Sequence, residues 1–199
     1  MKLVIIGATG LVGNEVIKLL KKVNLDKFNE LKMIASQSSK GKEICFQDKK
    51  ILVESFDDIN FDDHNVFINC SSSDLALQIY EKIKDTKSIL IDNSSALRLH
   101  PQVSLVVPHI NFPKSRNNIF ANPNCSTIIL SCLLEPLQDY GFERLVISTY
   151  QAASGAGKEG LEELELQMKQ YSNQESLTTD FWKRQYVNNC FVHNSSLTK

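Results

Sequence analysis

The chain has 199 residues, of which 42% are hydrophobic and 23% charged, and its formal net charge is −1. This near-neutral balance excludes the strongly basic composition typical of proteins that bind nucleic acids or anionic membranes, so we expect neither partner. The apolar run 3–7 is too short for a membrane span or a signal peptide, which predicts a cytoplasmic protein. The five cysteines are scattered without a Cys-x-x-Cys pair, which predicts free thiols and no metal site.

A glycine-rich turn follows the first predicted strand. Residues 2–6 form a short apolar run of the kind that is buried in parallel sheets. The sequence GATGLVG (7–13) then opens a helix with apolar residues at helical spacing. Glycines beside a helix N-terminus let the backbone approach a phosphate closely, and the helix dipole favours the anion. A tight βα turn alone would also use these glycines, but their place directly after a strand favours a dinucleotide site.

The loop after the second predicted strand bears on the choice of cofactor. That strand is predicted over 31–36 and completes a βαβ unit. The loop 36–42 contains serines, Lys40 and Lys42 but no acidic residue. In dinucleotide-binding folds an acid here binds the ribose 2′-hydroxyl, whereas basic and hydroxyl groups suit a 2′-phosphate. The loop therefore favours NADP over NAD, while each lysine taken alone fits a solvated basic loop equally well.

Polar residues end one of the next strands. Strands are predicted over 65–70 and 88–92, with a serine-capped helix between them, and the second strand runs into DNSSALR (92–98). Polar residues at the carboxyl end of a parallel strand lie where open α/β sheets bind ligands. Arg98 is therefore a candidate ligand for phosphate or carboxylate, with a surface ion pair as the alternative. Short strands over 105–108 and 118–121 continue the alternation of strands and helices.

A cysteine lies on a tight turn at the start of a predicted helix, in NPNCST (122–127). A helix N-terminus favours a thiolate, so Cys125 suits a nucleophile; a buried apolar role is the alternative for any free cysteine. The apolar spacing extends this helix through Ile129, Leu133 and Leu137 to Gly141. Cys132 is predicted to lie in the core.

The last clear patterns are a strand over 145–151 and a helix that begins near Lys158. The apolar residues of this helix are predicted to pack inward, and they are Leu161, Leu164, Met168 and Tyr171. Its acid cluster is predicted to be a solvated face, and it consists of Glu162, Glu163 and Glu165. Beyond Ser172 aromatic residues are dispersed among polar ones without a period.

Taken together, the motifs resemble the aspartate-semialdehyde dehydrogenase family. In chain order they are GATGLVG (7–13), DNSSALR (92–98), VPHIN (107–111), NPNCST (122–127) and QAASGAGK (151–158). Five ordered motifs are much more specific than one. The resemblance implies an α/β fold in which a Rossmann-type doubly wound parallel sheet at 1–122 binds NADP. The first part of an α+β catalytic and dimerisation domain would follow at 123–199, and the protein would be a homodimer.

The family's activity is the reduction of aspartyl phosphate to aspartate semialdehyde with NADPH and release of inorganic phosphate, in lysine, threonine and methionine biosynthesis. By position, the resemblance implies that Cys125 is the nucleophile that forms a thioester and that Gln151 orients the substrate. Arg98 and Asn124 would bind the substrate and its phosphate. The implied cofactor residues are Gly7, Thr9, Gly10, Leu11, Val12, Gly13, Ser38, Ser39, Ser154 and Gly155.

The chain departs from the family pattern at three points. Ser38 stands where the family often has Arg near the 2′-phosphate, and serines 71–73 replace a glycine-containing turn. Family members are also much longer, and their catalytic histidine and a further substrate-binding arginine would follow Lys199. None of the chain's own histidines lies in a matching motif, and these are His64, His100, His109 and His193. We therefore expect the cofactor domain and only the first part of the catalytic domain.

Two alternatives stay open. The chain could be a dinucleotide-binding module without catalytic activity, because a missing general acid or base costs about 10² to 10⁴ in rate. It could also be a member of the related N-acetylglutamyl-phosphate reductase family. Asn124 argues against that family, which has glycine at this place.

Overall fold

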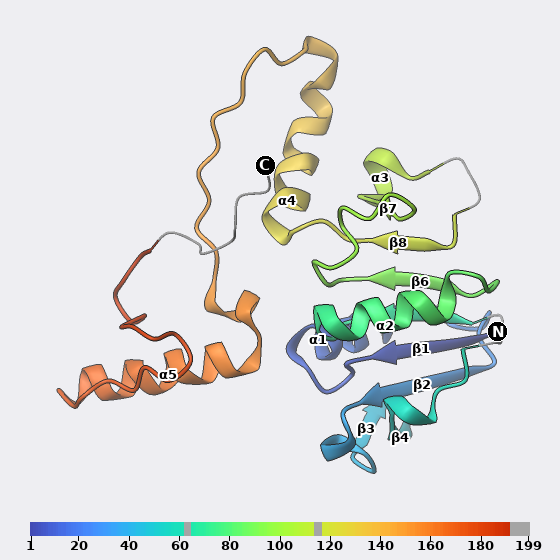
Figure 1. Ribbon diagram of the computed structural model, residues 1–199, viewed down its shortest axis with the longest axis horizontal. Helices are drawn as coiled ribbons and strands as arrows, with labels where there is room; N and C mark the ends of the chain where they lie inside the picture. Colours follow the sequence, from blue (N-terminus) through green and yellow to red (C-terminus); the bar gives the residue numbers. More distant parts are fainter. Residues whose placement is uncertain (62–64, 114–116, 192–199) are drawn as a thin grey trace. The chain divides into compact units, whose positions relative to one another are not determined.

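The computed structural model describes residues 1–61, 65–113 and 117–191 (Figure 1). The chain divides into two compact units, Met1–Thr149 and Tyr150–Lys199, and each is described by itself. Two of the four histidines, His64 and His193, lie outside the described residues.

Eight strands of the described part of the first unit form one sheet in the order β3-β4-β2-β1-β5-β6-β8-β7. The strands are β1 (Lys2–Ile6), β2 (Glu30–Ala35), β3 (Glu43–Phe46), β4 (Lys49–Ser55), β5 (Val66–Asn69), β6 (Ile89–Asp92), β7 (Ser104–Leu105) and β8 (Ile119–Ala121). Only the β3–β4 pair is antiparallel, and Figure 1 shows the arrowheads of β1, β2, β6 and β8 pointing the same way. The chain starts centrally at β1, moves outward through β2 and returns to β5 on the other side. This reversal is the switch point at which open α/β sheets bind ligands, so the predicted α/β, doubly wound Rossmann-type fold is confirmed.

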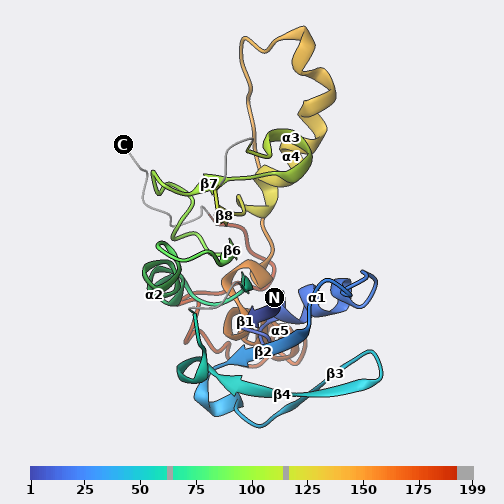
Figure 2. The same cartoon turned by 90° about the vertical axis from the view of Figure 1, so that its right-hand side faces the viewer.

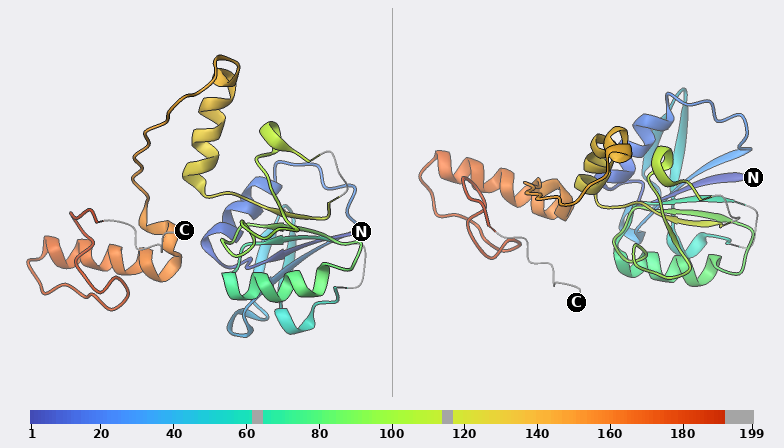
Figure 3. Two further views of the ribbon diagram at one scale, coloured as in Figure 1. Left: turned by 45° about the horizontal axis from the view of Figure 1, so that its top comes forward. Right: turned by 90° about the horizontal axis from the view of Figure 1, so that it is seen from above.

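Two helices cover the two faces of the sheet, because alternate strand residues point to opposite sides. Helix α1 (Leu11–Leu20) packs its buried Ile17 with Ile5 of β1, whereas α2 (Ser73–Ile83) packs with Val4 and Ile6. Figure 2 and Figure 3 show α1 and α2 on opposite sides of the sheet. Both faces of β1 are therefore shielded from solvent, which explains why its sequence is a continuous apolar run.

A β-hairpin follows β2, so the prediction of strict βα alternation up to Cys125 was wrong. The hairpin joins β3 to β4 through a turn at Gln47, whose φ is +51° (Figure 2). Residues 43–55 contain two short apolar runs, 44–46 and 51–53, on either side of the polar residues 47–50, a pattern that fits two strands and a turn. Phe46 and Val53 bury their side chains in the same cluster as Ile17 of α1.

The helix that begins at Cys125 is shorter than predicted. Helix α4 (Cys125–Leu134) gives way to a 3₁₀ segment, 135–140, because Pro136 cannot donate a backbone hydrogen bond and its ring clashes with the preceding turn. Gly141 ends this segment with a φ of +72°. Cys132 is exposed, so its predicted core position was wrong.

Two predicted strands also changed. The strand expected over 105–108 is confined to β7, because Pro108 starts the short helix α3 (Pro108–Asn111). The strand expected over 145–151 is absent from the described residues, and its apolar side chains, such as Val146, are exposed. A strand needs a neighbour for its N–H and C=O groups, and no described strand lies beside this segment.

The second unit consists of a 3₁₀ turn at 153–156 and helix α5 (Lys158–Ser172), onto which residues 177–187 fold back. The prediction that the whole acid cluster is solvated was wrong for Glu163, which is buried. Burial alone would raise the pKa of Glu163. The backbone N–H groups of Phe181, Trp182 and Asp180 donate to its carboxylate, however, and hold its pKa below the usual range.

Gln167, one turn further along α5, also binds the backbone of the returning segment, in this case through its side-chain amide. Its Nε2 donates to the carbonyl of Thr178, and its Oε1 accepts from the N–H groups of Tyr186 and Val187. The apolar face predicted for α5 is partly wrong, because Met168 and Tyr171 are exposed. The helix holds the returning chain through side-chain to backbone hydrogen bonds, which a hydrophobic period does not reveal.

Candidate active site

The glycine turn after β1 has the geometry of an anion-binding turn. Gly7 has a φ of +81°, and a Cβ at this position would lie 2.7 Å from the carbonyl of Cys70. A Cβ at Gly13 would lie 2.1 Å from the Gly7 oxygen, so both positions require glycine. The first N–H groups of α1 have no partner within the helix, and its first turn has no acidic residue. These N–H groups lie where the glycine spacing predicts a phosphate site, and that site stays a prediction.

The loop after β2 lies against this turn. Thr9 Oγ1 donates to Ser39 Oγ at 3.4 Å, and Lys42 Nζ donates to the same oxygen at 3.4 Å. Ser39 is buried, whereas Ser38 is exposed and shares a hydrogen bond with Ser36. The structure thus brings predicted cofactor residues from two loops, Thr9 and Ser39, into direct contact.

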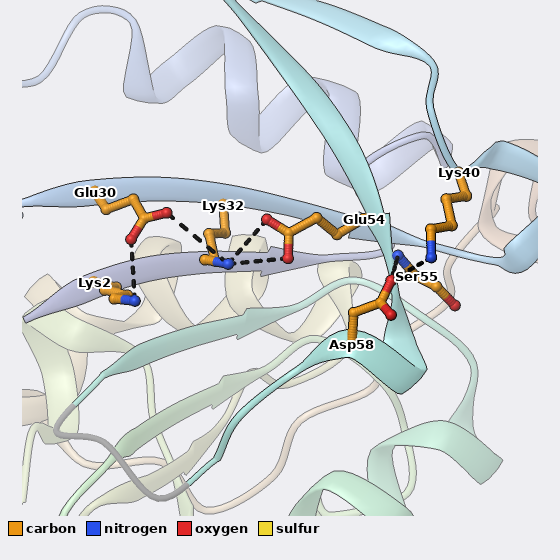
Figure 4. A network of polar contacts seen from close by, with 7 residues as sticks. All are labelled: Lys2, Glu30, Lys32, Lys40, Glu54, Ser55 and Asp58. Atoms are coloured by element: carbon orange, nitrogen blue, oxygen red, sulfur yellow. Dashed lines mark hydrogen bonds and ion pairs between the residues drawn. The ribbon is translucent and has the colours of Figure 1, made fainter.

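The other lysine of this loop has a different partner. Lys40 Nζ lies 2.9 Å from Asp58 Oδ2, and Figure 4 shows the two side chains turned toward each other. The hydrogen bond from Lys40 lowers the pKa of Asp58, and the same bond raises the pKa of Lys40. Asp58 also accepts from the backbone N–H of Ser55 at the end of β4. A second ion-pair chain in Figure 4, from Lys2 through Glu30 and Lys32 to Glu54, lies across β1, β2 and β4.

A buried polar pair joins the ends of β5 and β6. Asn69 and Asp92 are register partners on these strands, and both are 0% exposed. Asn69 Nδ2 donates to Asp92 Oδ1 at 2.6 Å, and Ser94 Oγ donates to Asp92 Oδ2 at 2.8 Å. Asn69 Oδ1 in turn accepts from the N–H and the hydroxyl of Ser71, in the loop that packs against Gly7. This pair was missed from the sequence, although Asp92 ends the predicted strand 88–92 and Asn69 is the last residue but one of the predicted strand 65–70.

A second set of bonds extends this cluster toward the cysteine turn. Asn93 Nδ2 donates to the carbonyl of Asn69 at 2.9 Å, and Asn122 Nδ2 donates to Asn93 Oδ1. Arg98 Nε donates to the Asn122 carbonyl at 2.9 Å. The predicted phosphate ligand Arg98 therefore lies at the turn that precedes Cys125, with part of its guanidinium bound to backbone.

Cys125 is the first residue of α4 and is exposed. Asn124 caps the helix: its Oδ1 accepts from the Ser126 N–H at 3.0 Å and lies 3.8 Å from Cys125 Sγ. The turn follows β8, and the glycine turn follows β1, so both lie at the carboxyl edge of one parallel sheet. An exposed thiol and the glycine turn thus share the edge at which such sheets bind ligands.

Another thiol at this edge is chemically distinct. Cys70 follows β5, and burial raises the pKa of its thiol to about 11, although Asn93 donates a hydrogen bond to the sulfur. Cys70 therefore stays protonated at neutral pH and is a poor nucleophile. Among the described residues no three His, Cys, Asp or Glu side chains are arranged as metal ligands.

Three predicted site residues belong to the second unit. Gln151 is exposed just before the 3₁₀ turn, and Ser154 and Gly155 lie within that turn, also exposed. Of the described histidines, His100 packs its ring 4.5 Å from that of Tyr80, and His109 is exposed in α3.

Comparisons with known proteins agree with this geometry. The family model for the semialdehyde dehydrogenase NAD-binding domain matches residues 2–118, and the model for the dimerisation domain matches residues 134–199. Aspartate-semialdehyde dehydrogenases of Rickettsia conorii and a Synechocystis strain are 38% and 35% identical to this chain over 98% and 100% of its length. The chain spans 59% of the length of each of these relatives.

Solved structures give the same result. Aspartate semialdehyde dehydrogenase II of Vibrio cholerae is 31% identical, with a TM-score of 0.88 over 99% of this chain and 60% of that protein. The same enzyme complexed with ASA has a TM-score of 0.90 at 30% identity. No helix among the described residues combines the length and apolar composition that a membrane crossing requires. By its sequence motifs, its sheet and these matches, the chain belongs to the aspartate-semialdehyde dehydrogenase family.

Proposed function

We propose that the chain carries the cofactor site and the nucleophile of an NADP-dependent aspartate-semialdehyde dehydrogenase, which converts aspartyl phosphate to aspartate semialdehyde. The observation that carries the proposal is the exposed Cys125 at the start of α4, on the same sheet edge as the glycine turn. The matched relatives carry the name of this activity, and one matched structure is complexed with ASA.

Cys125 is proposed to act as the acyl acceptor. Its Sγ would attack the acyl carbon of aspartyl phosphate, and the carbon–oxygen bond to phosphate would break with its electron pair leaving on inorganic phosphate. Bound NADPH would supply the hydride that reduces the resulting thioester. The carbon–sulfur bond would then break, which returns the thiolate and releases the aldehyde. Arg98 and Asn124 would bind the substrate's anionic groups, and Gln151 would orient it.

The cofactor would bind across the glycine turn. The missing Cβ atoms at Gly7 and Gly13 let the turn pack directly on the Cys70 carbonyl and on its own backbone, which supports a tight turn that brings the N-terminus of α1 to the end of β1. Thr9, Leu11 and Val12 would offer N–H groups to it, and Gly10, whose own N–H donates to the Gly7 carbonyl at 3.0 Å, would let the pyrophosphate approach the backbone. Ser38 and Ser39 would meet the adenosine ribose, and Ser154 and Gly155 the nicotinamide. One matched structure, from Candida albicans, is 25% identical and is described with NADP.

Further parts of the proposal concern the whole protein. The match at 134–199 supports a homodimer through the dimerisation domain. We retain 1–122 and 123–199 as the cofactor and catalytic domains. We place the activity in the cytoplasm, in the pathway to lysine, threonine and methionine.

The test is phosphate- or arsenate-dependent reduction of NADP by aspartate semialdehyde. We expect Cys125→Ala to abolish the reaction and Cys132→Ala, an exposed thiol on the same helix, to retain it. Activity that survives Cys125→Ala would refute the assignment of Cys125 as the nucleophile. Binding of NADPH by the wild-type chain without turnover would instead show a nucleotide-binding module, and the catalytic part of the proposal would fall.

A further inference from the structure

A row of three residues lies just beyond the carboxyl ends of the adjacent parallel strands β5, β6 and β8. The members of this edge row are Cys70, Asn93 and Asn122. The backbone ladder of the sheet still reaches them, because the Asn93 N–H donates to the Asn69 carbonyl at 3.0 Å and the Asn122 N–H donates to the Asp92 carbonyl at 2.8 Å. The three side chains are therefore neighbours across the edge of the sheet.

Hydrogen bonds join the side chains of the edge row in one direction. Asn93 Nδ2 donates to the Asn69 carbonyl at 2.9 Å and to Cys70 Sγ at 3.5 Å. Asn122 Nδ2 donates in turn to Asn93 Oδ1. Because a backbone carbonyl can only accept, each amide has a single orientation that satisfies these bonds. The side chains thus extend the pairing of the strands beyond the backbone ladder.

Arg98 lies across two members of the edge row. Its Nε donates to the Asn122 carbonyl at 2.9 Å, and its Nη2 donates to the Asn93 carbonyl at 3.5 Å. Its Nη1 makes no hydrogen bond with any residue that the structure describes. A guanidinium that is bound to the protein through one edge can present its remaining N–H groups to an anion. The separation of Asn93 and Asn122 therefore determines where these groups lie.

The edge row also leads into the turn that carries Cys125. Strands β6 and β8 lie side by side, and α4 follows β8 after this turn (Figure 1). The backbone pairing of the region is short, because β8 has three residues and its outer neighbour β7 has two. The Asn122 side chain adds a bond from the first residue of the turn to the end of β6. A displacement of about 1 Å in a reacting group can cost about 100-fold in rate, so a bond that fixes this turn bears on the chemistry.

We propose that Asn93 and Asn122 are positioning residues, whose side-chain bond holds the free N–H groups of Arg98 and the thiol of Cys125 at a fixed separation. The inference rests on the proposed function and deepens it, because it names residues that set the geometry of the site without contacting the substrate. Asn93 acts through Arg98, and Asn122 acts through both Arg98 and the cysteine turn.

The experiment compares the alkylation of Cys125 by iodoacetate and by iodoacetamide in the full chain. The two reagents have nearly the same size, and only iodoacetate carries a carboxylate that a guanidinium binds. Peptide mass spectrometry gives both rates at Cys125 and at Cys132, the exposed thiol on the same helix that serves as the reference. One charge-assisted hydrogen bond predicts that the ratio of the iodoacetate rate to the iodoacetamide rate is about 10-fold higher at Cys125 than at Cys132. Arg98→Gln should remove this preference.

The variants of the edge row should behave like Arg98→Gln although they retain the arginine. We expect Asn93→Ala and Asn122→Ala each to lower the ratio at Cys125 about 5- to 10-fold, and the double variant to lower it no further, because the two residues act through one bond. Any effect of the helix N-terminus on the thiol is common to all variants and cancels in the comparison.

Asn118→Ala is the matched control. Asn118 directly precedes β8 at its other end, and its Nδ2 donates to the carbonyls of Thr86 and Ser88 at 3.1 and 2.9 Å. The control therefore removes the same kind of side chain and two hydrogen bonds from the same strand, away from the cysteine turn. Its ratio at Cys125 should stay within about twofold of the wild type. General loosening of β8 would lower the ratio in this variant too.

Each result decides between the inference and its alternatives. The inference would be overturned by an equal ratio at the two thiols of the wild type, by an unchanged ratio in Asn93→Ala or Asn122→Ala, or by an equal loss in Asn118→Ala. Because alkylation needs neither cofactor nor turnover, the expected ratios in a chain that does not reduce NADP would refute the proposed activity and support the positioning role. Turnover together with an unchanged ratio in Asn93→Ala would do the reverse.

Discussion

The role of the buried Asn69–Asp92 pair in stability can be tested with an isosteric substitution that replaces its hydrogen-bond donor by an acceptor. In Asn69→Asp, the amide that donates to Asp92 Oδ1 at 2.6 Å is replaced by an oxygen, so two carboxyls face each other at positions that are 0% exposed. When a buried carboxyl group loses the donor of its hydrogen bond, the free energy of unfolding falls by about 3 kcal/mol. For a unit of this size that corresponds to a fall in Tm of roughly 10 °C.

The reciprocal double variant supplies the control. In Asn69→Asp with Asp92→Asn, the amide at position 92 donates to the carboxylate at position 69, and its oxygen still accepts from Ser94. The carboxylate at 69 still accepts from the N–H and hydroxyl of Ser71, so every bond of the pair is retained and only the bond between the two side chains reverses its direction. We expect most of the lost stability to return. Asn24→Asp, the same chemical change in an exposed turn, should have little effect.

Urea unfolding followed by far-UV circular dichroism measures the effect. If the single variant Asn69→Asp has the wild-type midpoint, the pair does not stabilise the sheet edge. The single variant Asp92→Asn completes the comparison. If the double variant loses as much stability as Asn69→Asp and Asp92→Asn lose together when measured separately, the two side chains do not interact as the structure describes.

Three further predictions concern thiols, pH and the glycine turn. At pH 8 iodoacetamide should modify the exposed Cys125 well before Cys70, because burial raises the pKa of the Cys70 thiol to about 11. Peptide mass spectrometry of a time course measures the order of modification, and the reverse order would contradict this prediction. Because the pKa of Glu163 is lowered in the folded state, its charge stabilises the second unit above its unfolded pKa, and this contribution disappears as pH falls through the folded value. Fluorescence of Trp182, the chain's one tryptophan, should follow this acid transition, and Glu163→Gln should remove that part of the pH dependence; an identical profile in the variant would refute it. Gly13→Ala should destabilise the fold and weaken nucleotide binding, because the alanine Cβ would lie 2.1 Å from the Gly7 oxygen. A variant with the affinity and the Tm of the wild type would show that the turn is looser than described.

The central sheet and the glycine turn could be predicted because their signals are local. A continuous apolar run, glycines at fixed spacing and a helical period all lie within residues 2–20. The serine cap of α2 is also local, because Ser72 directly precedes the helix that it caps. The β3–β4 hairpin was missed because its apolar runs, 44–46 and 51–53, are only three residues long and follow a loop of polar residues. Its place at the sheet edge depends on pairing with β2.

The polar clusters could not be predicted because their partners are distant in the sequence. Asn69 and Asp92 are 23 residues apart and meet only through strand register. Glu163 looked like a member of a solvated acid cluster, and only the return of residues 180–182 to α5 buries it. In the same way, Lys40 and Lys42 look equivalent as sequence, and their different partners depend on the backbone at Gly41 and on Asp58.

The extended segment after Gly141 affects how the chain behaves in solution. Residues 145–150 read LVISTY, with β-branched and aromatic side chains, no charge and no proline, and Val146 and Tyr150 are 81% and 90% exposed. Such a window can pair edge to edge with its own copies, which is the first step of aggregation. Glu143 and Arg144 flank it as charged residues that oppose this stacking. Recombinant preparations of the chain should therefore gain solubility when this window is covered or given a charge, at no cost to the sheet that holds the glycine turn.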